Sequence, residues 1–125
     1  MTRIYEISIP HFTTEGTFDA AIRQLSALDS LEIDALYLLP INPTDITNSK
    51  SPYCITDNFE VRKELGGANG LKLFTEAAHV KGMKVILDVV LNHASINHTF
   101  ANDSDFFALD GNKSPFHPIG TNWND

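Results

Sequence analysis

The sequence predicts an α/β fold in which short parallel strands alternate with helices, and three observations point to this class. Runs rich in apolar and β-branched residues occupy 4–9, 35–39 and 84–91. The middle run is continuous, as expected of a strand that is buried on both faces of a parallel sheet. Between the runs, apolar residues recur every three or four positions, which is the period of a helix. Strand and helix in alternation are typical of βαβ units.

The N-terminal third supplies two of these strands and one helix. Residues 4–9 (IYEISI) form a β-branched-rich run that Pro10 stops, so a strand is predicted there. After Gly16 a helical pattern begins, and residues 35–39 (ALYLL) form the second strand, which Pro40 ends. The apolar face of the helix consists of Phe18, Ala21, Ile22, Leu25 and Leu28.

The rest of the chain supplies a loop, a second helix and a third strand. The loop runs over 42–68, and Asn69 is a plausible N-cap for the helix that follows. Gly82 is the stop signal of that helix, and 84–91 (KVILDVVL) is a strand with a single charge in its middle, Asp88. The inner face of the helix is predicted to be Leu71, Phe74, Ala77 and Ala78.

Two architectures use this strand–helix order, the (β/α)8 barrel and the doubly wound open sheet. Both place ligands at the carboxyl ends of the strands, here residues 10–11, 40–42 and 92–93. No glycine-rich phosphate loop follows any of these strands, and the segment PHFTTEGTF after the first lacks the G-x-G-x-x-G pattern. A nucleotide-binding sheet is therefore disfavoured.

Composition limits the classes of partner. The chain has 125 residues, of which 42% are hydrophobic and 20% charged, an ordinary globular balance, and its net charge is -7. This acidity disfavours nucleic acid and anionic membrane surfaces, whereas it is compatible with a neutral sugar. A single cysteine, Cys54, excludes an internal disulfide. Neither a signal peptide nor a membrane span is recognisable, so we expect a cytoplasmic protein and no membrane partner.

The segment Asp88-Val-Val-Leu-Asn92-His93 carries the most specific signal. A charge among aliphatic residues is costly unless it is paired or hydrogen-bonded, so Asp88 either supports its neighbours or faces a site. Asn92 and His93 place two polar side chains at the ligand-binding edge of the sheet. The other histidines show no metal-ligand spacing with a carboxylate, and we expect them at the surface: His11, His79, His98 and His117.

The segment DVVLNH resembles the motif D-x-x-x-N-H that ends the third barrel strand in the α-amylase family, glycoside hydrolase family 13. Four further segments resemble that family in the right order: IDALYLLPINP, SPYCITDNFEVRKELGG, HVKGMKVILDVV and FFALDGNKSPFHPIGTNWND. The resemblance covers nearly the whole chain. It implies a partial TIM (β/α)8 barrel, with the first three β/α units in 1–93 and the start of the long loop after strand 3 in 94–125.

The resemblance also implies roles for five residues. His93 corresponds to the histidine that hydrogen-bonds the sugar at the cleavage subsite, and Tyr53 to the tyrosine that stacks beneath that sugar. Asn92 corresponds to a residue that binds a structural calcium in many members, and its amide oxygen suits that hard cation. Asp88 and Asp57 correspond to residues that support the site and take no part in the chemistry.

The same resemblance implies an α-glucan or maltooligosaccharide substrate and retaining hydrolysis or transglycosylation. The catalytic carboxylates of the family come from later strands, and no carboxylate of this chain matches them. We therefore expect an N-terminal fragment of a glycosidase that is inactive by itself and that can self-associate through exposed sheet edges. The alternative is a non-catalytic carbohydrate-binding or structural remnant of the barrel.

Overall fold

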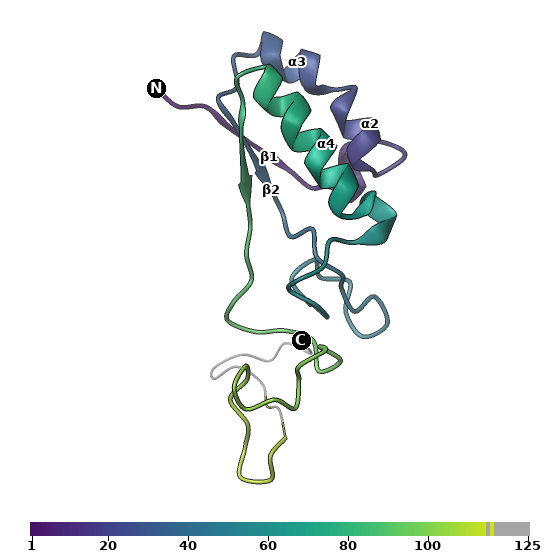
Figure 1. Ribbon diagram of the computed structural model, residues 1–125, viewed down its shortest axis with the longest axis vertical. Helices are drawn as coiled ribbons and strands as arrows, with labels where there is room; N and C mark the ends of the chain where they lie inside the picture. The colour runs from purple at the N-terminus through teal and green to yellow at the C-terminus, as the bar shows by residue number, and fades with distance from the viewer. Residues whose placement is uncertain (115, 117–125) are drawn as a thin grey trace. The chain divides into compact units, whose positions relative to one another are not determined.

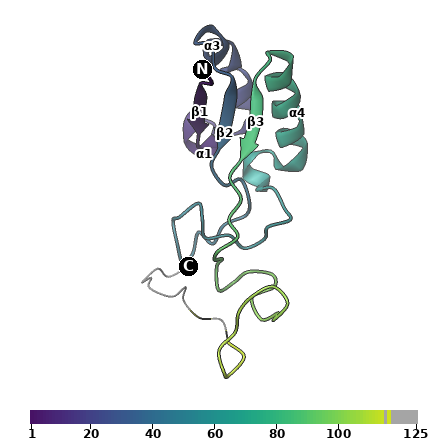
Figure 2. The ribbon, with the colours of Figure 1, turned by 90° about the vertical axis from the view of Figure 1, so that its left-hand side faces the viewer.

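A computed structural model describes residues 1–114 and 116 of the chain. It contains one sheet of three parallel strands in the order β1-β2-β3, which Figure 2 shows side by side. Ile7 of β1 is in register with Leu38 of β2, which in turn pairs with Leu87 of β3. The predicted parallel sheet is confirmed. The elements are β1 (Ile4–Ile7), α1 (Ile9–Phe12), α2 (Phe18–Ile22), α3 (Leu25–Ser30), β2 (Ala35–Leu38), η1 (Lys63–Leu65), α4 (Gly67–Val80) and β3 (Lys84–Leu87).

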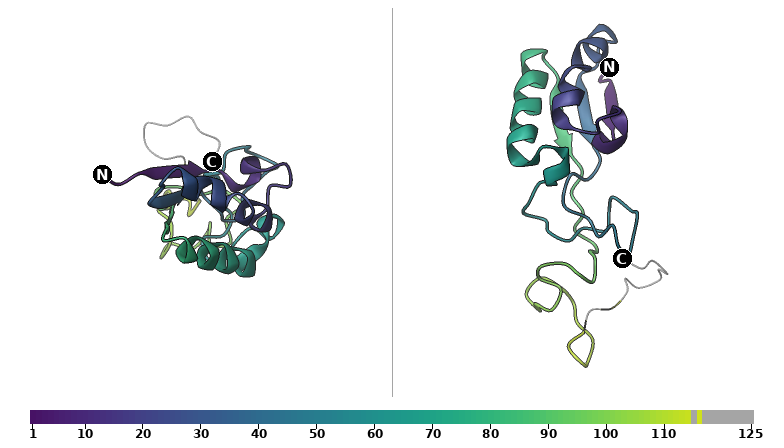
Figure 3. Two further views of the ribbon diagram at one scale, coloured as in Figure 1. Left: turned by 90° about the horizontal axis from the view of Figure 1, so that it is seen from above. Right: turned by 90° about the vertical axis from the view of Figure 1, so that its right-hand side faces the viewer.

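The chain divides into two compact units. The first, called here the β/α unit, comprises Met1–Ile41 and Glu60–Val89 and holds all helices and strands of the described residues. The second, called the loop unit, comprises Asn42–Phe59 and Val90–Asp125. Within the β/α unit, α2, α3 and α4 lie on one face of the sheet, as Figures 1 and 3 show from several sides. The predicted boundary between 1–93 and 94–125 concerns the barrel and its loop, and it stays a prediction.

Between these helices and the sheet lies the core of the β/α unit. Phe18 and Phe74 are both fully buried, and their ring centroids are 5.8 Å apart at an interplanar angle of 48°. A side chain at Gly70 would place its Cβ 3.2 Å from Cδ2 of Phe18, so the absence of a side chain there lets α4 approach α2. The buried cluster consists of Ile7, Ile9, Phe18, Ala21, Leu25, Leu28, Leu36, Leu38, Ile41, Leu65, Phe74, Ala78 and Met83.

The first strand and the first helix differ from their predicted bounds. β1 ends at Ile7 because Pro10 belongs to the first turn of the short helix α1, where its fixed φ and missing N–H are tolerated. The predicted single helix after Gly16 is two helices, α2 and α3, separated at Arg23 and Gln24. Its predicted apolar face is confirmed, because the break leaves the apolar positions of both pieces directed at the core.

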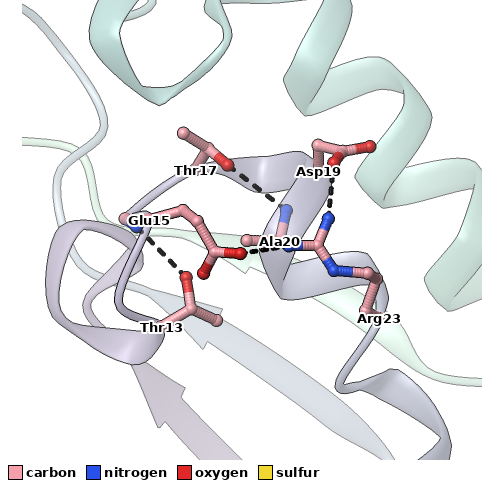
Figure 4. A network of polar contacts seen from close by, with 7 residues as sticks. Thr13, Glu15, Thr17, Asp19, Ala20 and Arg23 are labelled. Carbon is pink, nitrogen blue, oxygen red and sulfur yellow. Dashed lines mark hydrogen bonds and ion pairs between the residues drawn. The ribbon is translucent and has the colours of Figure 1, made fainter.

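A network of polar contacts fixes the start of α2 (Figure 4). The hydroxyl of Thr17 accepts a hydrogen bond from the backbone N–H of Ala20 at 3.2 Å, so Thr17 is the N-cap. The guanidinium of Arg23 contacts the carboxylates of Glu15 at 2.5 Å and Asp19 at 2.6 Å. These charged side chains are solvent-exposed, so the ion pairs contribute less to the stability of the helix than the N-cap does.

α4 begins earlier than predicted. Its first residue is Gly67, two positions before the expected cap Asn69, because the 3-10 turn η1 precedes it and Gly66 adopts a left-handed φ of 115°. A residue without Cβ adopts this conformation at little cost. Gly82, with a φ of 77°, follows the end of the helix as predicted.

The third strand is shorter and more exposed than predicted. β3 ends at Leu87 instead of continuing to 91, and the last hydrogen bond to β2 joins the N–H of Asp88 to the carbonyl of Leu38 at 2.9 Å. β2 itself stops there because Pro40, which lacks an N–H, follows shortly. In the described residues no further strand pairs with β3, so Leu87 remains 42% exposed.

Candidate functional site

The five predicted site residues are divided between the two units. Asp88 directly follows β3 in the β/α unit, whereas Tyr53, Asp57, Asn92 and His93 belong to the loop unit. The side chain of Asp88 is hydrogen-bonded to the neighbouring strand, β2. Its carboxylate accepts a hydrogen bond from the hydroxyl of Tyr37 on β2, and this bond is the main reason that the pKa of Tyr37 is raised. Asp88 is half-buried, so the apolar surroundings expected for it are only partial.

Within the loop unit, a backbone hydrogen bond links the segment of Tyr53 to the segment of His93. The N–H of Ser95 donates to the carbonyl of Ile55 at 2.9 Å. Tyr53 lies two residues before Ile55, and His93 lies two residues before Ser95. Both predicted sugar-contacting side chains are half-buried. The fold of this unit therefore ties together two backbone segments that are about forty residues apart, each close to a predicted site residue.

Asp57 lies next to a second such link. The N–H of Thr99 donates to the carbonyl of Thr56 at 2.9 Å. The carboxylate of Asp57 accepts a hydrogen bond from the N–H of Phe59 at 2.8 Å, which is the geometry of an Asx-turn. This contact gives Asp57 a local structural role, and its predicted support of a sugar site stays a prediction.

Asn58 and His98 form a polar contact that sequence reasoning did not find. Asn58 donates from Nδ2 to the carbonyl of Val90 at 3.0 Å, and its Oδ1 lies 2.9 Å from Nε2 of His98. Nδ1 of His98 accepts from the N–H of Phe100 at 3.1 Å, so the neutral tautomer with hydrogen on Nε2 satisfies both contacts. Asn42 adds a hydrogen bond to the carbonyl of Asn58 at 3.1 Å.

The expectation that His98 lies at the surface is therefore wrong. The residue is only 6% exposed, and burial lowers its pKa, opposed by the negative charge of Asp57. A lone histidine in a polar segment carries no sequence signal for this burial. His11 and His79 are exposed as expected, whereas His117 lies outside the described residues.

Asn92, the predicted calcium ligand, is exposed. A calcium ion takes six to eight oxygen ligands. In residues 1–114 and 116 no three aspartate, glutamate, histidine or cysteine side chains gather in a way that could hold a metal. The carboxylate of Asp45, which is buried in the same unit, is already surrounded by hydrogen-bond donors. The calcium assignment for Asn92 stays a prediction.

Residues 10–11, Asn42, Tyr53 and His93 are expected on one face of the sheet, because they follow or end parallel strands. Asn42, Tyr53 and His93 share the loop unit, whereas residues 10–11 belong to the β/α unit, so their grouping with the others stays a prediction.

Cys54 is fully buried, as a structural thiol is expected to be. No helix in the described part of the chain has the length and apolar character to cross a membrane.

Comparison with solved structures shows which class of fold this arrangement of strands and helices belongs to. A crystal structure of an alpha-amylase from Lactobacillus plantarum superposes with a TM-score of 0.86 at 33% identity, over 95% of this chain and 29% of that one. A crystal structure of a maltogenic alpha-amylase from Thermotoga neapolitana gives a TM-score of 0.85 at 30% identity, over 93% of this chain and 29% of the other. The fold is thus three strands of a (β/α)8 barrel with an adjoining loop segment.

The family follows from the sequence comparisons. The family description "Alpha amylase, catalytic domain" matches residues 7–114, so the chain belongs to the alpha-amylase family. It is 40% identical over 100 residues to an alpha-amylase of Haloarcula japonica and 43% identical over 90 residues to a malto-oligosyltrehalose trehalohydrolase of a Rhizobium species. These matches cover 78% and 72% of this chain, which spans about 15% of the length of either relative.

Proposed function

We propose that this chain contributes the sugar-contacting part of an α-glucan-active glycoside hydrolase that works with retention, by hydrolysis or transglycosylation. Membership of the alpha-amylase family supports the substrate class. The observation that carries the proposal for the site is the hydrogen bond from Ser95 to Ile55, which ties the segment of Tyr53 to that of His93. In the proposed site, the ring of Tyr53 stacks on the C–H face of the sugar, and the imidazole of His93 hydrogen-bonds a hydroxyl.

The proposed role of the chain is to bind and orient the sugar. Retaining glycosidases need a carboxylate nucleophile and a carboxylic acid about 5–5.5 Å apart. We assign neither role to a carboxylate of this chain and propose that the remainder of the barrel supplies both. Asp57, in its Asx-turn, would keep the backbone after Tyr53 in place, and Asp88, which Tyr37 hydrogen-bonds, would do the same for the backbone directly after β3.

Three further expectations belong to the same proposal. The protein acts in the cytoplasm, in carbohydrate metabolism. An isolated chain self-associates through the open edge of β3, where Leu87 and Ile86 are more than a third exposed. Calcium, if bound, involves the amide oxygen of Asn92.

The experiment is His93→Ala in the full-length protein, with His79→Ala as the matched control because His79 is exposed on α4. Hydroxyl contacts strengthen as the sugar approaches its oxocarbenium-like transition state. Losing a hydrogen bond of about 1.5–3 kcal/mol corresponds to roughly a ten- to hundredfold fall in kcat and in kcat/KM on maltooligosaccharides. The KM and the melting temperature should change little.

An unchanged kcat/KM for His93→Ala would remove His93 from the proposed site. A full-length protein that binds maltooligosaccharide without turnover would instead favour a non-catalytic carbohydrate-binding protein over an enzyme.

A further inference from the structure

Asp45 is a buried carboxylate in the loop unit, with 6% of its surface exposed. Burying a carboxylate is costly unless hydrogen bonds compensate it. One of its oxygens, Oδ2, accepts from the hydroxyl of Ser95 at 2.7 Å, from Nδ2 of Asn97 at 2.8 Å and from Nδ2 of Asn48 at 2.9 Å. The other, Oδ1, accepts from the backbone N–H groups of Thr47 at 3.2 Å and Asn48 at 3.1 Å. Five donors thus surround one carboxylate.

These contacts reach both segments that carry the proposed sugar-contacting residues. The backbone N–H of Asp45 donates to the carbonyl of Cys54 at 2.9 Å, and Cys54 directly follows Tyr53. The side chain of Asp45 accepts a hydrogen bond from Ser95, which lies two residues after His93. A single residue therefore contacts the immediate neighbourhood of Tyr53 through its backbone and that of His93 through its carboxylate.

We propose that Asp45 is a positioning residue of the carbohydrate site, which sets the separation and orientation of Tyr53 and His93 without contacting the sugar. This inference rests on the proposed function for its catalytic consequence. Its structural part, that Asp45 helps to join the segments 42–59 and 90–101, rests on the hydrogen bonds of Asp45 and does not depend on the proposed function. A displacement of about 1 Å in a binding group is enough to reduce turnover by roughly a hundredfold.

The negative charge is essential to this arrangement. The donors from Ser95, Asn48 and Asn97 hold the pKa of Asp45 well below its usual range, so the carboxylate stays ionised at any pH at which the enzyme would be assayed. An amide at position 45 has nearly the same shape, but it presents an NH2 group to side chains that also donate. Asp45→Asn therefore tests the charge and the acceptor geometry with little change in volume.

The matched variants are Asp45→Asn, Asn97→Asp, the two combined, and Asp103→Asn. Asp103 lies in the same unit and is exposed, and its carboxylate accepts a hydrogen bond from the N–H of the nearby Asp105 at 2.9 Å. Its substitution therefore removes the same charge and leaves the hydrogen bonds of Asp45 in place. The full-length protein is assayed for kcat/KM on maltooligosaccharides. Hydrogen exchange is followed by mass spectrometry in peptides from 42–59, 90–101 and α4.

We expect Asp45→Asn to lower kcat/KM about ten- to hundredfold and to speed exchange in 42–59 and 90–101, with α4 unchanged. Asn97→Asp alone should do the same, because it places two carboxylates side by side. The combined variant should recover only part of both losses, because it restores the contact between positions 45 and 97 but leaves Ser95 and Asn48 donating to an amide. Asp103→Asn should match the wild type in every readout.

Faster exchange with normal kcat/KM would overturn the positioning role and leave Asp45 a purely structural residue. Exchange like that of Asp103→Asn would overturn the whole inference. Faster exchange in α4 as well would also overturn it, because the effect would then be general unfolding. If the wild-type protein turns over no α-glucan, the proposed function fails, and the exchange data still decide whether Asp45 joins the two segments.

Discussion

Phe74→Ala should remove a large share of the stability of the β/α unit. The ring of Phe74 is fully buried and pairs with that of Phe18 at 5.8 Å between centroids. Truncating a buried phenylalanine to alanine costs about 3–5 kcal/mol, and the lost ring pair, worth about 0.5–1.5 kcal/mol, favours the upper part of that range. A typical domain is stable by only about 5–15 kcal/mol, so the loss is readily measured.

The assay is urea unfolding followed by far-UV circular dichroism, with Leu73→Ala as the control. Leu73 precedes Phe74 on α4 but is 48% exposed, so its truncation removes little buried surface and should cost less than about 1 kcal/mol. Equal losses in the two variants, or a loss below about 1 kcal/mol for Phe74→Ala, would refute the reasoning that the Phe18–Phe74 pair is the centre of this core.

Three further predictions follow from the same structure. Gly16→Ala should lower the melting temperature more than Gly67→Ala: both have left-handed φ values, 65° and 62°, but only at Gly16 would the new Cβ meet a backbone atom, the carbonyl oxygen of Pro10 at 2.9 Å. Burial lowers the pKa of His98 in the folded protein, so below pH about 6.5 the unfolded chain binds more protons than the folded one. The free energy of unfolding should therefore fall as the pH is lowered from there through the folded-state pKa. His98→Gln should flatten that part of a plot of the urea midpoint against pH. The purified 125-residue chain should not turn over maltooligosaccharides, and turnover abolished by replacing one of its own carboxylates would contradict the assignment of both catalytic groups to the rest of the barrel.

The sequence by itself determined the class of fold and the family. Continuous apolar runs and the helical period of Phe18, Leu25 and Phe74 are local patterns, and all three side chains are buried as that period requires. The motif that ends in Asn92 and His93, together with four further segments in the right order, indicated the alpha-amylase family, because each of these patterns is local to one stretch of the chain.

The ends of the elements and the arrangement of the loop unit depended on tertiary structure. β3 stops where β2 ceases to offer hydrogen-bond partners, and no local signal in 84–91 records where its neighbour ends. The burial of His98 and the junction at Asp45 were missed because both depend on partners far along the chain, such as Ser95, fifty residues after Asp45. A polar side chain in a loop looks solvated in sequence. Only the folded chain shows that its hydrogen bonds come from another segment and that burial is thereby compensated.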